Sequence, residues 1–269
     1  MRNLREYYVG EKMDNVAYKS NNLLLRWLSY DQKSKKINIV CPGIHVDVDE
    51  KNMIQKHDED LFYEVDDYNL PYGDIVEVYL PFSHRDLETV GKELATLINT
   101  EPVFQQYQAI VLIGVGEAGV CFINMAKYLK RNVRIATIAT PFFGTGVADR
   151  KYFRKKIKGG IAKKLYSSLN RKYNFGNKQL AWNSEFLEEV NYDIMKKHRW
   201  INFVASSKGS KLTFQNILER YFGMKLYGNV RNDGITPVVS QGIDSYCKEI
   251  SISSTRNDAL SKALEYFRG

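Results

Sequence analysis

The sequence predicts an α/β fold in which a mostly parallel sheet is covered on both faces by helices. Short runs rich in Val and Ile alternate with segments of helical spacing along the chain, and this alternation is typical of parallel sheets with helical crossovers. No repeat, low-complexity tract or linker divides the 269 residues, and that length suits one large domain. We therefore expect a single domain over residues 1–269.

Six short apolar segments are predicted strands, and four longer segments are predicted helices. The strands are residues 36–44, 75–81, 109–113, 133–140, 200–205 and 247–253, and the helices are 86–99, 118–129, 183–198 and 258–267. In the first helix, apolar residues recur at Leu87, Val90, Leu94 and Leu97, which is helical spacing. The segment before residue 36 is predicted only as a polar region.

Composition indicates a globular protein, and cysteine usage indicates a reducing compartment. The apolar fraction of 44% is ample for a full core. The N-terminus has no apolar stretch of the kind found in signal peptides, and no run reaches the length of a membrane span. Cys41, Cys121 and Cys247 are scattered and lack zinc-site spacing. We expect a cytoplasmic location, with the membrane periphery as an alternative, and we expect neither a metal nor a cofactor.

The glycine-rich segment 109–121 is the most informative motif, and it fits two kinds of site. Its sequence, A-I-V-L-I-G-V-G-E-A-G-V-C, predicts a buried strand, a sharp turn and a helix start. Gly114, Gly116 and Gly119 match the G-x-G-x-x-G turn that binds dinucleotides. The same residues match the nucleophile elbow G-x-S-x-G, with Gly116 in place of the serine.

The dinucleotide interpretation lacks two features of that motif. The glycine turn normally closes the first strand–helix unit, whereas two predicted strands and a helix precede it here. An acidic residue is expected about 20 residues further on, after the next strand. That strand ends at Ile138-Ala-Thr-Pro141, and no carboxylate precedes Asp149. A dinucleotide-binding protein is therefore the second alternative.

Four further segments resemble those of α/β-hydrolases, in the order found in that superfamily. Residues 39–44 resemble the oxyanion strand and turn, and residues 138–149 resemble the Thr-Pro segment that follows the sixth strand of many lipases. Residues 231–241, R-N-D-G-I-T-P-V-V-S-Q, resemble the loop that carries the catalytic acid. Residues 251–267 resemble the segment that carries the catalytic histidine. The chain is thus similar to the lipase and esterase branch of the α/β-hydrolase superfamily.

The resemblance implies a catalytic triad with two of its three positions substituted. Gly116 stands at the nucleophile position without a side chain, and Asp233 stands at the acid position. Arg256 aligns with the histidine, or Asn257 with a slip of one residue. Neither side chain accepts a proton near neutral pH. The chain is therefore expected to be a pseudo-hydrolase, in which Asp233 pairs with Arg256 or serves only as a turn residue.

Other residues near the predicted elbow offer an alternative. By the resemblance, Gly43 and Ile44 belong to the oxyanion turn, and the backbone N–H of Glu117 belongs to the oxyanion hole. The Glu117 side chain either replaces the nucleophile or is a first-turn acid favoured by the helix dipole. An active carboxylic-ester or lipid hydrolase with an unorthodox or mutated nucleophile is thus the first alternative. His198, between Lys197 and Arg199, is expected to face solvent.

A basic segment provides the electrostatic signature of the chain. The net charge is +8, and residues 150–178 contain eleven cations and no acid. By the resemblance, residues 150–182 form a cap after the Thr-Pro segment. Apolar residues recur at intervals of four from 153 to 169, as in a basic amphipathic helix, with Gly159-Gly160 interrupting it. The residues expected to contact anions are Arg154, Lys155, Lys156, Lys158, Lys163 and Lys164.

Two interpretations of this cap remain open. Its apolar stripe either packs over the active-site region with the cations in water, or it docks onto an anionic lipid surface or an acidic protein. Nucleic acid ranks below these partners, because no RNA- or DNA-binding motif accompanies the cations. The expected function is that of a catalytically inactive binding or accessory protein that acts through the basic cap.

Overall fold

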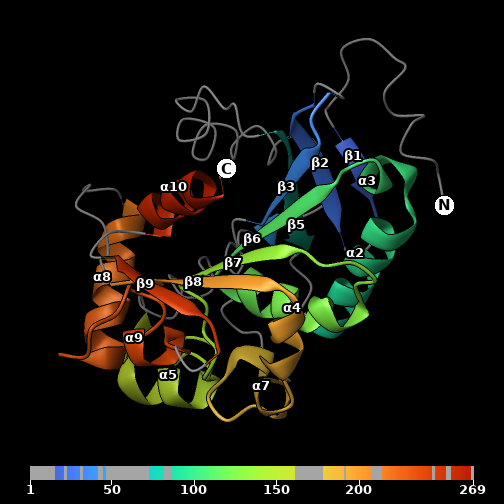
Figure 1. Cartoon of the computed structure of the whole chain (residues 1–269). Helices are drawn as coiled ribbons and strands as arrows, with labels where there is room; N and C mark the ends of the chain where they lie inside the picture. Colours follow the sequence, from blue (N-terminus) through green and yellow to red (C-terminus); the bar gives the residue numbers. More distant parts are fainter. Residues whose placement is uncertain are drawn as a thin grey trace.

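A mixed sheet forms the centre of the molecule (Figure 1). The structure, a computed structural model, describes residues 16–20, 23–30, 33–41, 45–46, 73–81, 86–160, 178–190, 192–206, 214–243, 246–252 and 256–267. In these ranges the strand order is β1-β2-β5-β3-β6-β7-β8-β9, with β4 paired to the end of β5. The strands are β1 Val16–Lys19, β2 Leu24–Ser29, β3 Lys36–Cys41, β4 His45–Val46, β5 Asp74–Pro81, β6 Ala109–Val115, β7 Arg134–Ile138, β8 Arg199–Ala205 and β9 Lys248–Ile252.

Most strand pairs are parallel, as predicted. Among the described strands, β1 pairs with β2 and β2 with β5 in antiparallel fashion, and every other strand pair is parallel. The helices are α2 Leu87–Thr100, α3 Pro102–Gln105, α4 Glu117–Met125, α5 Arg150–Lys156, α7 Glu185–Glu188, α8 Phe214–Tyr227, α9 Val238–Gln241 and α10 Arg256–Tyr266. Short 3₁₀ turns are η2 Ala126–Tyr128, η3 Lys178–Leu180 and η4 Tyr192–Lys197.

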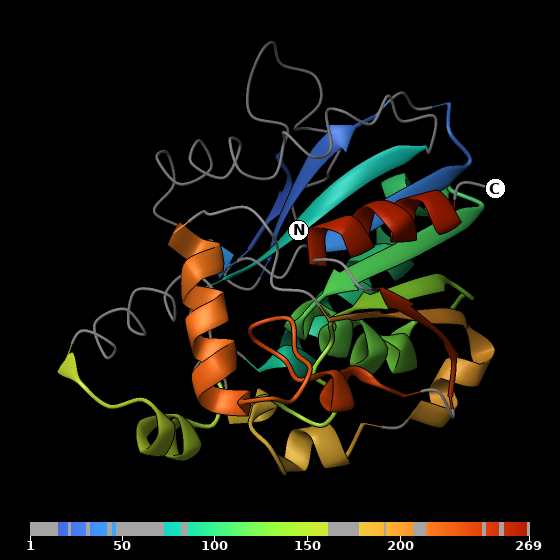
Figure 2. The ribbon, with the colours of Figure 1, turned by 90° about the vertical axis from the view of Figure 1, so that its left-hand side faces the viewer.

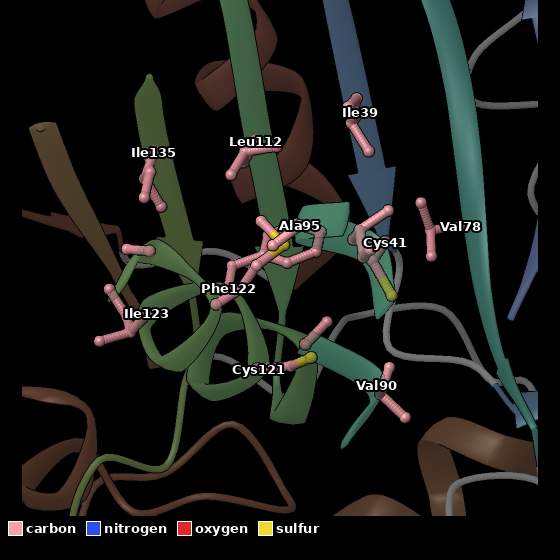
Figure 3. Packing of buried hydrophobic residues seen from close by; sticks show 14 of the residues in the cluster. Ile39, Cys41, Val78, Val90, Ala95, Leu112, Cys121, Phe122, Ile123 and Ile135 are labelled. Carbon is pink, nitrogen blue, oxygen red and sulfur yellow. The ribbon is translucent and has the colours of Figure 1, made fainter. Parts of the chain in front are cut away.

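Alternate residues of the central strands pack on opposite faces of the sheet. Leu112 of β6 lies in the larger core with α2 and α4, whereas Val111 and Ile113 lie in the smaller core with α10. Figure 3 shows Leu112 of β6 and Phe122 of α4 among the buried residues of the larger core. Because strand side chains alternate in direction, each strand contributes to both cores. Helices therefore cover both faces, as the sequence predicts.

The order in which strands are added to the sheet changes direction between the neighbouring strands β3 and β6. The chain leaves β3 towards β5 on one side and leaves β6 towards β7 on the other. In open parallel sheets, ligands bind outside the carboxyl ends of the strands at such a switch point. Cys41, the last residue of β3, pairs with Gly114 of β6. The segments predicted to hold the oxyanion turn and the elbow therefore leave the sheet side by side.

The single helix predicted over 183–198 is wrong. The segment forms α7 and then the 3₁₀ turn η4. Tyr192 begins η4, and its ring lies parallel to that of Trp200 in β8, with an interplanar angle of 11° and centroids 6.3 Å apart. Phe142 meets both rings edge-on. We attribute the break in the helix to this aromatic packing, which positions residue 192 against the sheet.

The expected exposure of His198 is also wrong, because the side chain is buried at the start of β8. Its Nδ1 accepts a hydrogen bond of 3.3 Å from the Val133 backbone N–H. Burial lowers the pKa of this imidazole below its ordinary value. The charged neighbours of His198 therefore did not indicate its environment. Strands β1 and β2 and helix α8 were likewise not predicted from the sequence.

Only the two ends of the predicted cap lie in the described ranges. Its first part forms α5, capped by the Asp149 carboxylate, which accepts from Tyr152 N at 2.9 Å. Helix α5 ends at Lys156, ahead of Gly159 with φ +105°. Residues 161–177, including Lys163 and Lys164, lie outside the described residues, so the cap of 150–182 and its boundaries stay a prediction. No helix in the described part combines the length and apolar character needed to cross a bilayer.

Candidate active site

Gly116 forms an abrupt bend between β6 and α4. Strand β6 ends at Val115 and α4 begins at Glu117, so one residue makes the whole turn. Gly116 has φ 60° and ψ −125°, a conformation that costs a residue with a side chain about 1–3 kcal/mol. Its N–H donates to Ile138 O at 2.8 Å, and its carbonyl accepts from Gly119 N at 3.1 Å. The bend has the strand–turn–helix form of a nucleophile elbow.

The three glycines of this bend differ in what a side chain would meet. A Cβ on Gly114 would lie 2.7 Å from both the carbonyl carbon of Ala118 and the nitrogen of Gly119. A Cβ on Gly119 would lie 1.9 Å from Thr140 Oγ1. A Cβ on Gly116 would meet nothing within 4 Å. The outer glycines are thus required by close packing, whereas the central position has room for a side chain.

Glu117 and Cys121 lie on the first turns of α4. Glu117 is buried and stands in the first turn, where the helix dipole favours a carboxylate. The Cys121 thiol is buried and lies 3.6 Å from Leu87 O, to which it donates. Burial raises the pKa of Cys121 well above its ordinary value, and Cys41 and Glu117 add to the shift. Cys121 is therefore a protonated core thiol and a poor nucleophile.

The predicted acid, Asp233, lies in a tight turn after α8. Its side chain is 1% exposed, and Oδ1 accepts from the backbone N–H groups of Ile235 at 2.9 Å and Thr236 at 2.7 Å. The preceding Asn232 uses its Oδ1 in the same way, accepting from Gly234 N at 3.0 Å. Gly234 has φ +102°, which favours glycine. Side-chain oxygens thus organise this turn.

Gln241 attaches the acid loop to the end of β8. The side chain is fully buried, and its Nε2 donates to Ala205 O at 3.0 Å and to Thr236 O at 3.1 Å. Its Oε1 accepts from Ala205 N at 2.9 Å. Behind the loop, Tyr227 OH donates to Ile235 O at 2.5 Å. Burial raises the pKa of Tyr227, and the charge of Asp233 contributes to that shift.

Backbone hydrogen bonds connect the elbow to the acid loop along the carboxyl edge of the sheet. Beyond the bond from Gly116 to Ile138, Ala139 N donates to Phe203 O of β8 at 3.0 Å. Ala139 has φ 49°, which is uncommon for a residue with a Cβ. Phe143 N then donates to Ser240 O in α9 at 3.4 Å. The loops after β6, β7 and β8 therefore form one connected edge.

The remaining predicted site residues are described only in part. Gly43 and Ile44 lie outside the described residues. Arg256 is the first residue of α10, which follows the carboxyl end of β9, but its side chain is outside the described part. The ion pair between Arg256 and Asp233 thus stays a hypothesis. The four described cations of the predicted anion site, Arg154, Lys155, Lys156 and Lys158, are exposed on α5 or just after it.

Sequence reasoning missed Gln241 and Tyr227 as supports of the acid loop. The only signal for Gln241 was its place at the end of the Asn-Asp-Gly…Ser-Gln motif. Tyr227 carried no signal, because it lies at the end of the unpredicted helix α8. Among the described residues, no group of three or more His, Cys, Asp or Glu is placed to hold a metal.

The chain resembles solved lipase structures in fold. No protein-family model matches it, and no curated protein matches its sequence. The mature form of the Bacillus licheniformis lipase BlEst2 is similar, with a TM-score of 0.57 and 15% identity over 93% of this chain and 96% of that one. The propeptide form of that lipase gives a TM-score of 0.56 and 16% identity over 90% of this chain and 51% of that one. The chain thus has an α/β-hydrolase fold, as the sequence analysis expected.

Proposed function

We propose that this chain is a catalytically inactive α/β-hydrolase-fold protein that acts as a binding or accessory protein. The observation that carries the proposal is the bend at Gly116. The backbone at this position has the shape of a nucleophile elbow and has room for a side chain, but the residue is glycine and carries none. Ester hydrolysis on this fold requires a hydroxyl at the elbow, an imidazole to accept its proton and a carboxylate to orient the imidazole.

The proposed loss of catalysis involves two positions. Gly116 offers no nucleophile, and an arginine at position 256 stays protonated and cannot serve as a base. Asp233 retains a carboxylate in a rigid turn, but without an imidazole it has nothing to orient. Restoring one group alone is therefore expected to restore no activity, because the three groups of a triad act as a unit.

Hydrolysis of p-nitrophenyl esters tests the proposal. Wild type and Gly116→Ser are expected to show no turnover above the uncatalysed rate. The double variant Gly116→Ser/Arg256→His is expected to gain turnover, and adding Asp233→Asn is expected to remove most of it. The matched control is Gly116→Ala/Arg256→His, which has the new imidazole but no hydroxyl. Turnover by the wild type would contradict the proposal.

The burial of Glu117 beside the bend supports an active ester hydrolase as a second candidate. In that case the wild type would hydrolyse esters, and Glu117→Gln would abolish the activity in a protein that still unfolds cooperatively. Asp233→Asn would lower the same activity. The dinucleotide alternative makes a different prediction, which is thermal stabilisation of the wild type by NAD or FAD.

A further inference from the structure

The exposed cations of α5 form one charged surface. Lys151, Arg154, Lys155 and Lys156 are exposed on the helix, and Lys158 is exposed just after it. No salt bridge neutralises these five within the described ranges, although Lys156 lies over the Tyr152 ring at 5.6 Å. Five unneutralised cations within eight residues produce a strong local positive potential.

The outer face of α8 carries an apolar stripe next to further cations. Ile217 and Met224 are 48% and 57% exposed, and Tyr221 lies between them at helical spacing, half-buried. Lys225 is exposed on one side of the stripe and Arg220 is half-buried on the other. Large apolar side chains are seldom left in water as a stripe unless a partner covers them.

Helices α5 and α8, which carry these two surfaces, pack against each other (Figure 2). Phe153 of α5 and Phe222 of α8 are buried, with ring centroids 5.6 Å apart. Tyr152 OH donates to the Leu226 carbonyl at 2.6 Å. The inner faces of both helices are thus used in packing. The cations and the stripe lie on the surfaces that this packing leaves free.

Exposed large apolar side chains are concentrated in two of the connections between strands. In the described part, every large apolar residue that is strongly exposed lies in the connection from β7 to β8 or from β8 to β9. These residues are Phe143, Ile217, Met224, Val230, Val239 and Tyr246. Both connections start at the carboxyl edge, where the elbow and the acid loop lie. Among the described residues, the connection from β5 to β6, which holds α2 and α3, has none.

We propose that α5 and the outer face of α8 form a docking surface for an anionic lipid bilayer. Cations near such a bilayer gain electrostatic energy, and apolar side chains beside them gain by insertion below the headgroups. Apolar side chains without cations would suit any apolar partner, and cations without apolar side chains would suit any polyanion. Their combination favours an anionic membrane surface. This inference names the partner of the cap in the proposed function but does not depend on whether the elbow is catalytic.

Co-sedimentation of the full chain with vesicles tests this surface. Binding is expected with phosphatidylcholine vesicles that contain 30% phosphatidylserine, weak binding with phosphatidylcholine alone, and release as salt rises. The variant Arg154→Gln/Lys155→Gln/Lys158→Gln is expected to bind on the order of 100-fold more weakly. Its matched control, Lys35→Gln/Lys197→Gln/Lys262→Gln, removes the same charge from exposed lysines outside α5 and α8 and is expected to bind within about threefold of wild type.

The stripe is tested separately by Ile217→Ser/Met224→Ser. This variant is expected to bind anionic vesicles about tenfold more weakly while the thermal midpoint stays within about 2 °C of wild type, because both side chains face outwards. A large fall in the midpoint would mean that these two side chains pack within the chain itself, and would overturn the proposal.

Two further outcomes would also overturn it. One is an equal loss of vesicle binding in the α5 variant and in its charge-matched control. The other is an absence of vesicle binding together with salt-sensitive binding to polyglutamate, which would assign the surface to an acidic protein. Ester hydrolysis by the same preparation would contradict the proposed function and leave this inference intact.

Discussion

The elbow and the acid loop lie on the same edge of the sheet but keep their shapes by opposite means. The elbow requires glycine at Gly114 and Gly119, because a Cβ at either position would clash with neighbouring atoms. The acid loop depends on side chains that are present, since Asn232, Asp233 and Gln241 each bond backbone groups of the loop or of β8. The bend at the elbow therefore keeps its shape even when position 116 has no nucleophile. The acid loop, in contrast, needs its polar side chains in order to fold, whether or not they take part in catalysis.

This contrast changes how the retained Asp233 is interpreted. A carboxylate that accepts two backbone N–H groups stabilises its turn whether or not it orients an imidazole. Its presence is therefore compatible with an inactive protein. At the elbow, by contrast, only a nucleophile would require a side chain at position 116.

The largest effect is expected from a methyl group on an outer glycine of the elbow. Gly114→Ala should lower the free energy of unfolding by about 3 kcal/mol, because the new Cβ would meet backbone atoms at 2.7 Å. Gly116→Ala is the matched control. It should cost only about 1–2 kcal/mol, since its Cβ meets nothing and only the positive φ is unfavourable. Urea unfolding measures both, and equal losses would contradict the difference between the glycines.

The next effect concerns the anchor of the acid loop. Gln241→Leu should cost about 2–3 kcal/mol, because it removes three hydrogen bonds and leaves the Ala205 N–H buried without its acceptor. Gln105→Leu in α3 is the control, because it removes a single hydrogen bond, from Gln105 Nε2 to Ile98 O at 2.6 Å, on an exposed residue, and it should cost about 1 kcal/mol. Hydrogen exchange at the Ala205 amide should accelerate in the first variant. An unchanged exchange rate would mean that the loop is held elsewhere.

A smaller effect separates the charge of Asp233 from its role as an acceptor. Asp233→Asn keeps an oxygen for the two N–H groups and should cost about 1 kcal/mol, whereas Asp233→Ala should cost about 2 kcal/mol. Urea unfolding of the three proteins at one pH measures the difference. If Asn were as costly as Ala, the charge itself would be required, which would favour an ion pair with Arg256.

The smallest effect is expected from His198, which directly precedes β8, and it depends on pH. Burial lowers the pKa of His198 below 6.5, so the folded protein binds this proton less tightly than the unfolded chain does. Stability should therefore be complete above pH 6.5 and decrease as the pH falls below it. Urea unfolding at pH 7.5 and 5.5 should show a larger loss for wild type than for His198→Gln. An imidazole that titrates at or above pH 6.5 by NMR would contradict this.

The sequence predicted most of the parallel sheet, because its strands are short apolar runs that end in recognisable turns. It did not predict α8, since apolar residues lie all around that helix. Phe222 and Leu226 face the interior while Ile217 and Met224 face outwards, so no clear period appears. The antiparallel strands β1 and β2 were not predicted either; β1 has four residues and forms the edge of the sheet, and β2 lies between it and β5. The same outward residues of α8 support the proposed docking surface.

For the candidate site, the sequence identified the bend and the acid loop, which rest on local motifs. It did not identify their supports. Tyr227 bonds Ile235 O from the end of α8, a helix that was not predicted, and Gln241 bonds Ala205 in β8, 36 residues away. The motif placed Gln241 at the end of the acid loop, but its partner in β8 depends on tertiary packing and leaves no pattern in the local segment.

The unoccupied side of the bend has a consequence for stability. Enzymes often hold a strained residue at the reactive position and sacrifice stability for activity. Glycine adopts φ 60° without that strain. Compared with the same chain carrying serine there, this protein avoids the compromise and should unfold at a higher denaturant concentration. Because the surrounding atoms have not moved into the space, installing a reactive group would require tolerance of strain rather than repacking of neighbours.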